Sequence, residues 1–83
     1  MDEIIFSRHC RAQMQERNIS EKPVLDCLKK PDKVGLQSDG RLRAIRKIRR
    51  FKKDYLIVVV FEQFFKRKEI VTVFYTSKFN KYL

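Results

Sequence analysis

The spacing of apolar and polar residues changes once along the chain, at about Pro31. Before Pro31 the apolar positions recur every three or four residues, which predicts helices. Residues 6–9 are expected to open the first helix with Ser7 as its N-cap, and Asn18 is expected to end it because asparagine tolerates the left-handed conformation. A second helix should begin at Ser20 and end before Pro31, since a proline forces the preceding residue out of the helical region.

After Pro31 the apolar residues alternate with polar ones or form short unbroken runs, which predicts strands. The Ser-Asp-Gly sequence at residues 38–40 is a hairpin signal. Residues 55–61 are apolar without interruption, which is typical of a central strand covered on both faces. Four strands are expected, at residues 33–37, 41–51, 55–62 and 69–76.

The predicted order is therefore two helices followed by four strands. Connections of hairpin length favour antiparallel pairing. We expect a single domain of residues 1–83 with an α+β fold, in which two N-terminal helices pack on one face of a four-stranded antiparallel sheet. A chain of 83 residues is long enough for one modest core and too short for two.

The charge balance adds a candidate partner. Lysine and arginine number 20 against 10 aspartate and glutamate residues, which gives a formal net charge of +10. Such a charge destabilises a compact chain unless an anion is normally bound, so nucleic acid is the first candidate. A membrane is disfavoured, because the longest apolar run has seven residues and a spanning helix needs about 20. The first residues lack the features of a secretory signal, so a cytoplasmic location is expected.

The two cysteines, Cys10 and Cys27, each lie in an apolar-periodic stretch. We expect both to be reduced and buried like small hydrophobic residues. A zinc site needs about four ligands, which two distant cysteines and a single histidine do not supply. Neither a metal nor a cofactor is expected.

The single histidine, His9, is the first candidate for chemistry. On a helix it shares its side with Gln13 and Arg17, which follow one and two turns later. At the edge of a helix–sheet interface a histidine can titrate near neutral pH and act as general acid or base. The alternative is a boundary histidine that is hydrogen-bonded to the backbone.

Arg46 is the second candidate, because strand alternation places it in the same apolar layer as Ala44 and Ile48. An inward guanidinium has to be paired or has to face a cleft, since burying it alone is costly. Arg46 is therefore either a structural partner of another group or a clamp for phosphate oxygens.

Residues 41–53 hold eight lysine and arginine side chains in thirteen positions. Alternation puts four of them on one side of the strand, in a row that can follow a phosphate backbone. These four are Arg41, Arg43, Lys47 and Arg49. The end of the chain adds polar and aromatic side chains suited to phosphates and bases. These are Thr76, Ser77, Lys78, Lys81 and Tyr82. The alternative for the whole set is a solvated surface.

Three segments resemble a known family. Residues 6–20 read FSRHCRAQMQERNIS and resemble the motif F-S-x-H-A-x-x-R-M-x-E-R-G-I-S. Residues 70–78 read IVTVFYTSK and resemble V-V-T-V-Y-P-T-S-K. Residues 40–46 read GRLRAIR and are similar to G-R-Y-V-A-I-K. These motifs belong to small uncharacterised domains related to RelE and ParE toxins. Such domains are grouped with the barnase, EndoU, colicin and RelE-like ribonuclease fold, in which helices precede a four-stranded antiparallel sheet.

The resemblance implies a toxin-type endoribonuclease that cleaves RNA without a metal, by attack of a ribose 2′-OH on the adjacent phosphate. His9 would be the general acid or base, and Arg17 and Arg46 would stabilise the developing charge. Thr76 and Ser77 would bind phosphate. The implied partners are mRNA, tRNA or ribosome-associated RNA, and an acidic antitoxin protein.

Two departures from the motifs leave alternatives open. Gln13 stands where the family has arginine, which removes a candidate phosphate ligand, and Tyr75 replaces a proline. A non-catalytic RNA- or DNA-binding module of the same fold would need only the basic residues. A protein-interaction module is the third hypothesis, either a homodimer through residues 55–61 or a toxin that acts by binding DNA gyrase.

Overall fold

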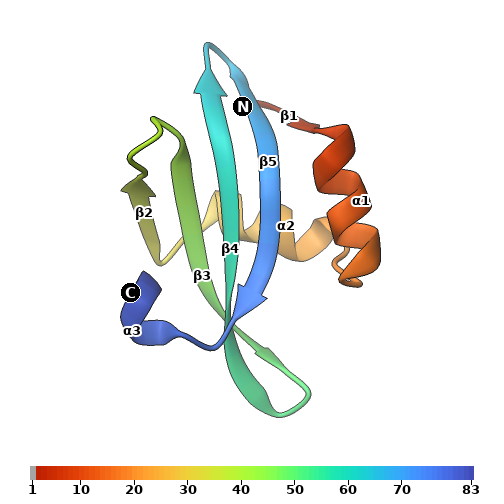
Figure 1. Cartoon of the computed structure of the whole chain (residues 1–83), viewed down its shortest axis with the longest axis vertical. Helices are drawn as coiled ribbons and strands as arrows, with labels where there is room; N and C mark the ends of the chain where they lie inside the picture. Colours follow the sequence, from red (N-terminus) through yellow and green to blue (C-terminus); the bar gives the residue numbers. More distant parts are fainter. Residues whose placement is uncertain (1) are drawn as a thin grey trace.

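The computed structural model describes residues 2–83. Its elements are β1 (Glu3–Phe6), α1 (Arg8–Glu16), α2 (Glu21–Lys29), β2 (Lys33–Leu36), β3 (Leu42–Arg50), β4 (Lys53–Phe64), β5 (Arg67–Thr76) and α3 (Phe79–Tyr82). The strands form one sheet in the order β1-β5-β4-β3-β2, with β4 at its centre (Figure 1). Among the described residues, no helix is both long and apolar enough to cross a membrane.

The expected fold class was wrong, because the sheet is five-stranded and mixed. It is not a four-stranded antiparallel sheet under two N-terminal helices. The four expected strands exist as β2 to β5 and pair in antiparallel fashion. The additional strand β1 pairs parallel with β5, so that Glu3 lies opposite Arg67. Four residues are too few to show an alternation, and the partner strand is distant in sequence, so no local pattern indicates this pairing.

The ends of α1 and α2 follow local chemistry. Ser7 Oγ accepts a hydrogen bond from the Cys10 N–H at 3.0 Å, which caps α1 as predicted. Asn18 has a φ of 56°, the left-handed conformation expected of it. Ser20 stands at the N-cap of α2 without a side-chain cap bond. Phe6, expected to open the first helix, is instead the last residue of β1.

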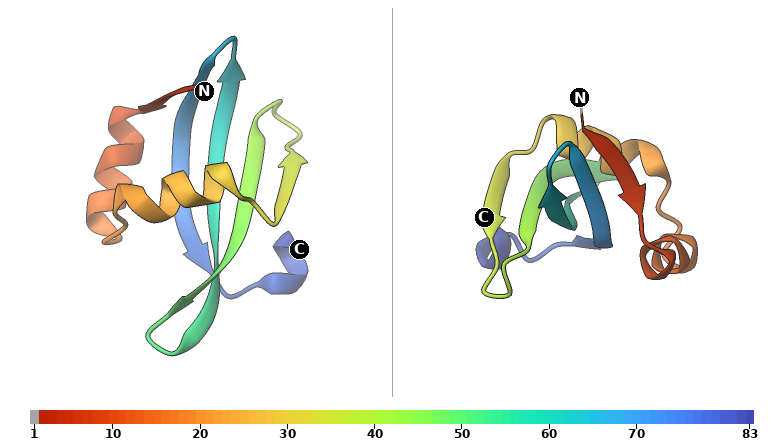
Figure 2. Two further views of the ribbon diagram at one scale, coloured as in Figure 1. Left: turned by 180° about the vertical axis from the view of Figure 1, so that it is seen from behind. Right: turned by 90° about the horizontal axis from the view of Figure 1, so that it is seen from above.

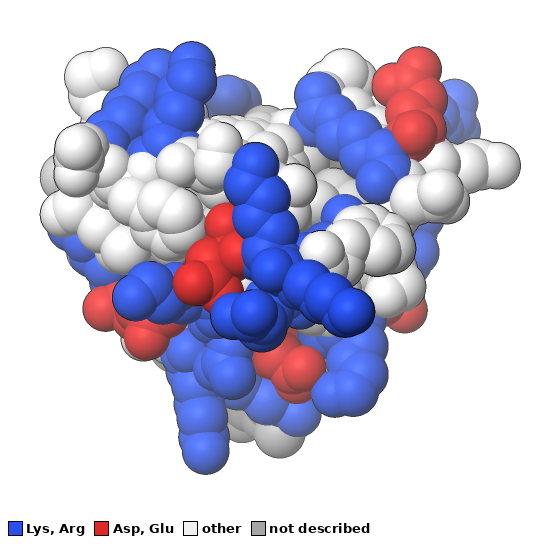
Figure 3. All heavy atoms as spheres, turned by 90° about the horizontal axis from the view of Figure 1, so that it is seen from below, with Lys and Arg blue, Asp and Glu red and all other residues white. Residues whose placement is uncertain are grey.

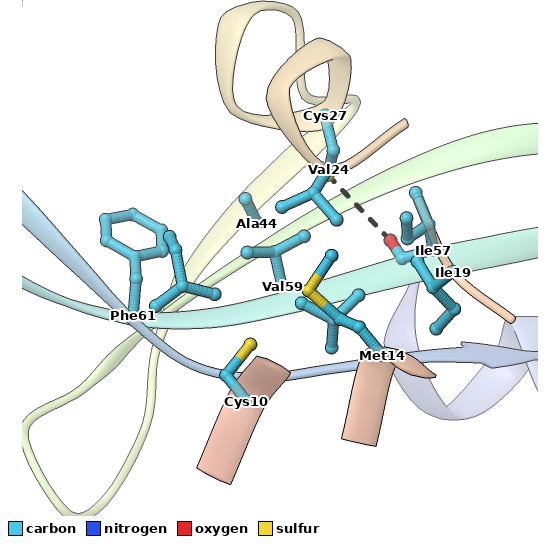
Figure 4. Close-up of a cluster of buried hydrophobic side chains, with 11 residues drawn as sticks. Cys10, Met14, Ile19, Val24, Cys27, Ala44, Ile57, Val59 and Phe61 are labelled. Carbon is cyan, nitrogen blue, oxygen red and sulfur yellow. Dashed lines mark hydrogen bonds between the residues drawn. The ribbon is translucent and has the colours of Figure 1, made fainter. Parts of the chain in front are cut away.

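Helices α1 and α2 pack on one face of the sheet and bury the larger core (Figure 4). Cys10 and Cys27 lie in this core as free thiols, which confirms the prediction for both. Cys27 Sγ donates a weak hydrogen bond to the Ile57 carbonyl at 3.9 Å. Burial raises the pKa of the Cys27 thiol to about 12 and also raises the pKa of Cys10. Both cysteines therefore stay neutral at physiological pH and are poor nucleophiles.

The opposite face of the sheet carries a second, smaller core. Ile45 of β3 packs there with Leu56 and Val58 of β4, and Phe79 and Tyr82 of α3 pack against this cluster. The centre of β4 is therefore buried on both faces, as its unbroken apolar run predicts. Figure 2 shows the sheet as an arch, with α2 across the outer side and α3 under one end. We call the inner side of this arch the concave face.

Strands β3 and β4 continue past both of their neighbours. Strand β2 pairs with β3 no further than Ile45, and β5 ends opposite Leu56. Residues 48–55 therefore form a ribbon of two strands, which extends from the lower end of the sheet in Figure 1. We call residues 48–55 the projecting hairpin.

Candidate functional site

The basic side chains of β3 line the concave face. Strand alternation puts Arg43, Lys47 and Arg49 on the same side as Ile45, which belongs to the second core, whereas Ala44 packs toward the helices. We call Arg43, Lys47 and Arg49 the basic row. At a rise of about 3.3 Å per residue the row is roughly 20 Å long. It ends in the projecting hairpin.

Arg41 is not free to extend this row. Its Nε lies 3.1 Å from Glu62 Oε1, and its Nη1 lies 3.7 Å from Asp39 Oδ2. Two carboxylates therefore neutralise Arg41 at the end of β3 that is farthest from the projecting hairpin.

Helix α3 packs against the basic row through Tyr82. The guanidinium carbon of Arg43 lies 5.1 Å from the centroid of the Tyr82 ring, and Lys81 Nζ lies 5.5 Å from the same centroid. Tyr82 also meets Phe74 edge to face, with ring centroids 5.8 Å apart. Tyr82, predicted to stack on bases, thus holds α3 against the sheet, and Arg43 already lies over its ring.

His9 and Arg17 lie on the flank of α1 that faces β5. Arg17 Nη1 donates a hydrogen bond to the Val73 carbonyl at 2.9 Å, on the stretch of β5 beyond its pairing with β1. Gln13, one turn earlier, accepts a hydrogen bond from the Thr72 hydroxyl. His9 lies a further turn back and is exposed. The structure therefore groups His9 with Gln13 and Arg17 beside β5, as their helical spacing predicts.

Arg46 lies on the helix-covered side of the sheet. Its Nη1 donates to the Lys30 carbonyl at 2.8 Å, directly after α2 ends. Strands β4 and β5 separate β3 from the edge where α1 packs, which is a distance of about 10 Å across the sheet. The structure therefore does not bring Arg46 to His9, and Arg46 has a structural partner in the backbone carbonyl of Lys30, the C-cap of α2.

Thr76 and Ser77 lie where β5 leads into α3. Thr76 is paired with Leu56, a residue of the second core, which places its side chain on the concave face. The Thr76 hydroxyl accepts a hydrogen bond from the Lys78 N–H at 3.1 Å and so shapes this turn. Ser77 and Lys78 are exposed beside it. Thr76 therefore lies on the same side of the sheet as the basic row.

Comparison with protein families matches residues 6–75 to a domain of unknown function, DUF4258. The chain belongs to the DUF4258 family. No curated protein and no solved structure matches the chain. The family match includes His9, Arg17 and the basic row, and it ends before Thr76 and α3.

The cations of this DUF4258 chain are neutralised unevenly. The acids of α2 form ion pairs with nearby basic residues. In the basic row Arg49 pairs with Asp54 Oδ1 at 3.3 Å, whereas within residues 2–83 neither Arg43 nor Lys47 forms an ion pair. Figure 3, viewed from the end of the projecting hairpin, shows lysine and arginine side chains over this end and on both sides of a hollow. The concave face and the projecting hairpin therefore carry Arg43 and Lys47, two cations that form no ion pair within residues 2–83, together with the ion pair of Arg49 and Asp54.

Three residues of the DUF4258 surface were not predicted from the sequence. Lys33 lies opposite Ile45 on the concave side, and its Nζ donates to the Leu83 carbonyl at 3.4 Å. Thr72 contacts Gln13 across a long sequence separation, which no local signal indicates. Phe51 is 87% exposed at the tip of the projecting hairpin. Its signal was present in the sequence, as an aromatic ring between two pairs of basic residues.

Proposed function

We propose that this DUF4258 domain binds RNA across its concave face. The observation that carries the proposal is the basic row, which presents Arg43, Lys47 and Arg49 along one strand. A polyanion laid along β3 can contact the exposed Lys47 and Arg49, and the half-buried Arg43 beside Tyr82 adds its positive charge to the same track. Each phosphate contact releases bound counterions. The carboxylate of Asp54 offsets only Arg49.

The choice of RNA over DNA rests on the resemblance of residues 6–20 and 70–78 to toxin-related ribonucleases. In the fold these two segments form α1 and most of β5, which pack against each other at one side of the concave face. An acidic protein that covers the basic row and restrains the domain, and a location in the cytoplasm, belong to the same proposal.

The binding proposal is tested by removing charge from one side of the sheet at a time. Lys47→Gln with Arg49→Gln should lower RNA affinity about tenfold or more and reduce the slope of log K against log salt by about 1.4 for single-stranded RNA. The matched control is Lys29→Gln with Lys30→Gln, which removes the same charge beside α2. Equal losses of RNA affinity in both double variants would show that binding depends on net charge alone, which would contradict the proposal.

Cleavage of the bound RNA is the second candidate function, and the position of His9 favours it. His9 is exposed on the flank of α1 that faces β5, in line with Arg17. In the proposed step the imidazole takes the proton of a ribose 2′-OH as this oxygen bonds to the adjacent phosphorus. The bond to the 5′-oxygen breaks, that oxygen takes a proton from a water molecule, and the His9 imidazolium returns its proton to the solvent. The products are a 2′,3′-cyclic phosphate and a 5′-OH, and Arg46 has no part in this step because it lies on the other side of the sheet.

The cleavage proposal is tested with end-labelled RNA in the presence of EDTA. The wild type should produce cyclic-phosphate ends, and His9→Ala should lose cleavage at least 100-fold while its RNA affinity changes less than threefold. Arg11→Ala on the opposite flank of α1 is the matched control. RNA that is bound but not cut by the wild type, or that is cut equally by His9→Ala, would leave the domain as a binding module.

A further inference from the structure

The two central residues of the turn in the projecting hairpin adopt a backbone conformation that is unfavourable for their residue types. Phe51 and Lys52 are its two central residues, between the paired Arg50 and Lys53, and their φ angles are 50° and 63°. Two consecutive positive φ angles are typical of the type I′ turn, which favours Asn-Gly. A bulky aromatic residue with positive φ is an outlier, because its Cβ crowds the backbone.

Within residues 2–83, the side chain of Phe51 is not buried in a way that would compensate for this conformation. The Phe51 ring is 87% exposed, and the guanidinium carbon of Arg50 lies 5.1 Å from the ring centroid. A ribbon of two strands is itself only marginally stable. Backbone strain retained at an exposed residue is a pointer to function rather than to stability.

The surroundings of Phe51 fit a nucleic acid. The sequence Arg-Arg-Phe-Lys-Lys at residues 49–53 places two cations on each side of the ring. The basic row ends next to this tip, since Arg49 is the second-last residue of β3 and Phe51 follows β3 as the first residue of the turn. Strands extend about 3.3 Å per residue, so a chain of phosphates that follows the row reaches the ring.

We propose that Phe51 stacks on an unpaired base of the bound RNA, and that the domain therefore selects single-stranded over fully paired RNA. The inference rests on the proposed function, because it takes the basic row as the track of the RNA backbone. A base in a duplex is already stacked on both faces and offers no surface to the ring. In a single strand each base has a free face, and aromatic side chains use this face in many proteins that bind single strands.

The test compares single-stranded and double-stranded RNA of equal length. A 12-nucleotide oligouridine and a 12-base-pair RNA duplex are titrated with the wild type and with Phe51→Asn, a substitution that suits a type I′ turn and keeps every positive charge. Phe51→Asn should bind the single strand about tenfold more weakly and the duplex within twofold of the wild type. The melting temperature of this variant should not fall, because asparagine tolerates positive φ.

Two further variants test whether the affinity for single-stranded RNA requires an aromatic ring at the tip of the projecting hairpin. Phe51→Trp introduces the only tryptophan of the chain, and it should keep the affinity while its fluorescence is quenched by oligouridine. Phe65→Asn is the matched control, because Phe65 is 90% exposed at the hairpin between β4 and β5 and lies beside Lys66. Its removal should change the affinity less than twofold.

Three outcomes would overturn the inference. Oligouridine affinity that is unchanged in Phe51→Asn, with the basic-row variant still impaired, would overturn the stacking role alone. Wild-type protein that binds neither RNA would overturn the proposed function as well. Sedimentation with phosphatidylserine vesicles that requires Phe51, together with unchanged RNA affinity, would assign the ring to a membrane surface.

Discussion

The two long hairpins of this domain have similar tips and opposite surroundings. Phe51 and Phe65 are both almost fully exposed, and a lysine with positive φ follows each of them. At the β4–β5 hairpin, Lys68 Nζ donates to Asp2 Oδ2 at 2.8 Å and Gln63 Nε2 donates to the same oxygen at 2.9 Å. The projecting hairpin, by contrast, has one ion pair among the described residues, which joins Arg49 and Asp54.

This difference indicates different roles for the two ends of the sheet. The β4–β5 hairpin is supported by β1, which pairs with β5 from Arg67 at the turn onward. Two of its cations, Arg67 and Lys68, form ion pairs with Glu69 and Asp2. The projecting hairpin has no neighbouring strand and an excess of cations. Polar groups that are satisfied internally stabilise a fold, whereas cations without partners are available to an anion from outside.

The largest expected effect is a loss of stability when the core is weakened at the base of the projecting hairpin. Leu56 is fully buried in the second core, at the point where β5 ends. Leu56→Ala should lower the free energy of unfolding by about 2–5 kcal/mol, because the lost contacts leave a cavity. Urea unfolding measures this change. Leu36→Ala, at a residue that is 75% exposed on β2, should stay within about 0.5 kcal/mol, and a comparable loss there would contradict the assignment of the core.

The next effect compares the two turns directly. Lys52 and Lys66 have φ angles of 63° and 58°, so Lys52→Gly and Lys66→Gly should each raise the free energy of unfolding by about 0.5–1 kcal/mol. Only Lys52→Gly should also weaken RNA binding, because it removes a cation of the projecting hairpin. Thermal unfolding and RNA titration of the same two variants check both statements. Equal RNA affinities would remove the functional difference between the hairpins.

A smaller effect follows from removing the acid of the projecting hairpin. Asp54→Asn should free Arg49 for a phosphate and tighten RNA binding by up to about fivefold at 0.1 M salt, which corresponds to one additional contact with a single strand. Glu69→Gln makes the same change of charge beside Arg67 at the other hairpin and should leave the affinity unchanged. A gain in both variants would indicate a response to net charge alone.

The smallest effect is a pH dependence at the β4–β5 hairpin. Hydrogen bonds from Lys68 and Gln63 lower the pKa of Asp2 below its usual value of 3.8. A carboxylate with a depressed folded-state pKa contributes stability above the unfolded-state pKa and loses it as pH falls through the folded-state pKa. The melting temperatures of the wild type and Asp2→Asn should therefore differ at pH 6 and converge on acidification below 3.8. A difference that does not change with pH would contradict this origin.

Much of the candidate site was predictable, because the spacing of residues within one helix or one strand determines which side chains share a side of that element. Helical periodicity placed His9, Gln13 and Arg17 on one flank of α1, and strand alternation placed the basic row on one side of β3. What spacing does not supply is the partner across the sheet. Arg17 could equally have pointed to a substrate or to the backbone, and only the packing of α1 on β5 assigns one of its N–H groups to the Val73 carbonyl.

The sequence by itself determined the local features of this protein. The cap at Ser7, the left-handed Asn18, the four antiparallel strands and the burial of both cysteines all follow from side-chain chemistry within a few residues. The tertiary structure alone decided the parallel pairing of β1 with β5, the placement of α3 on the concave face and the contact of Arg46 with the Lys30 carbonyl. These features join segments that are far apart in sequence, so their free energy depends on how whole elements pack and leaves no pattern in a local window.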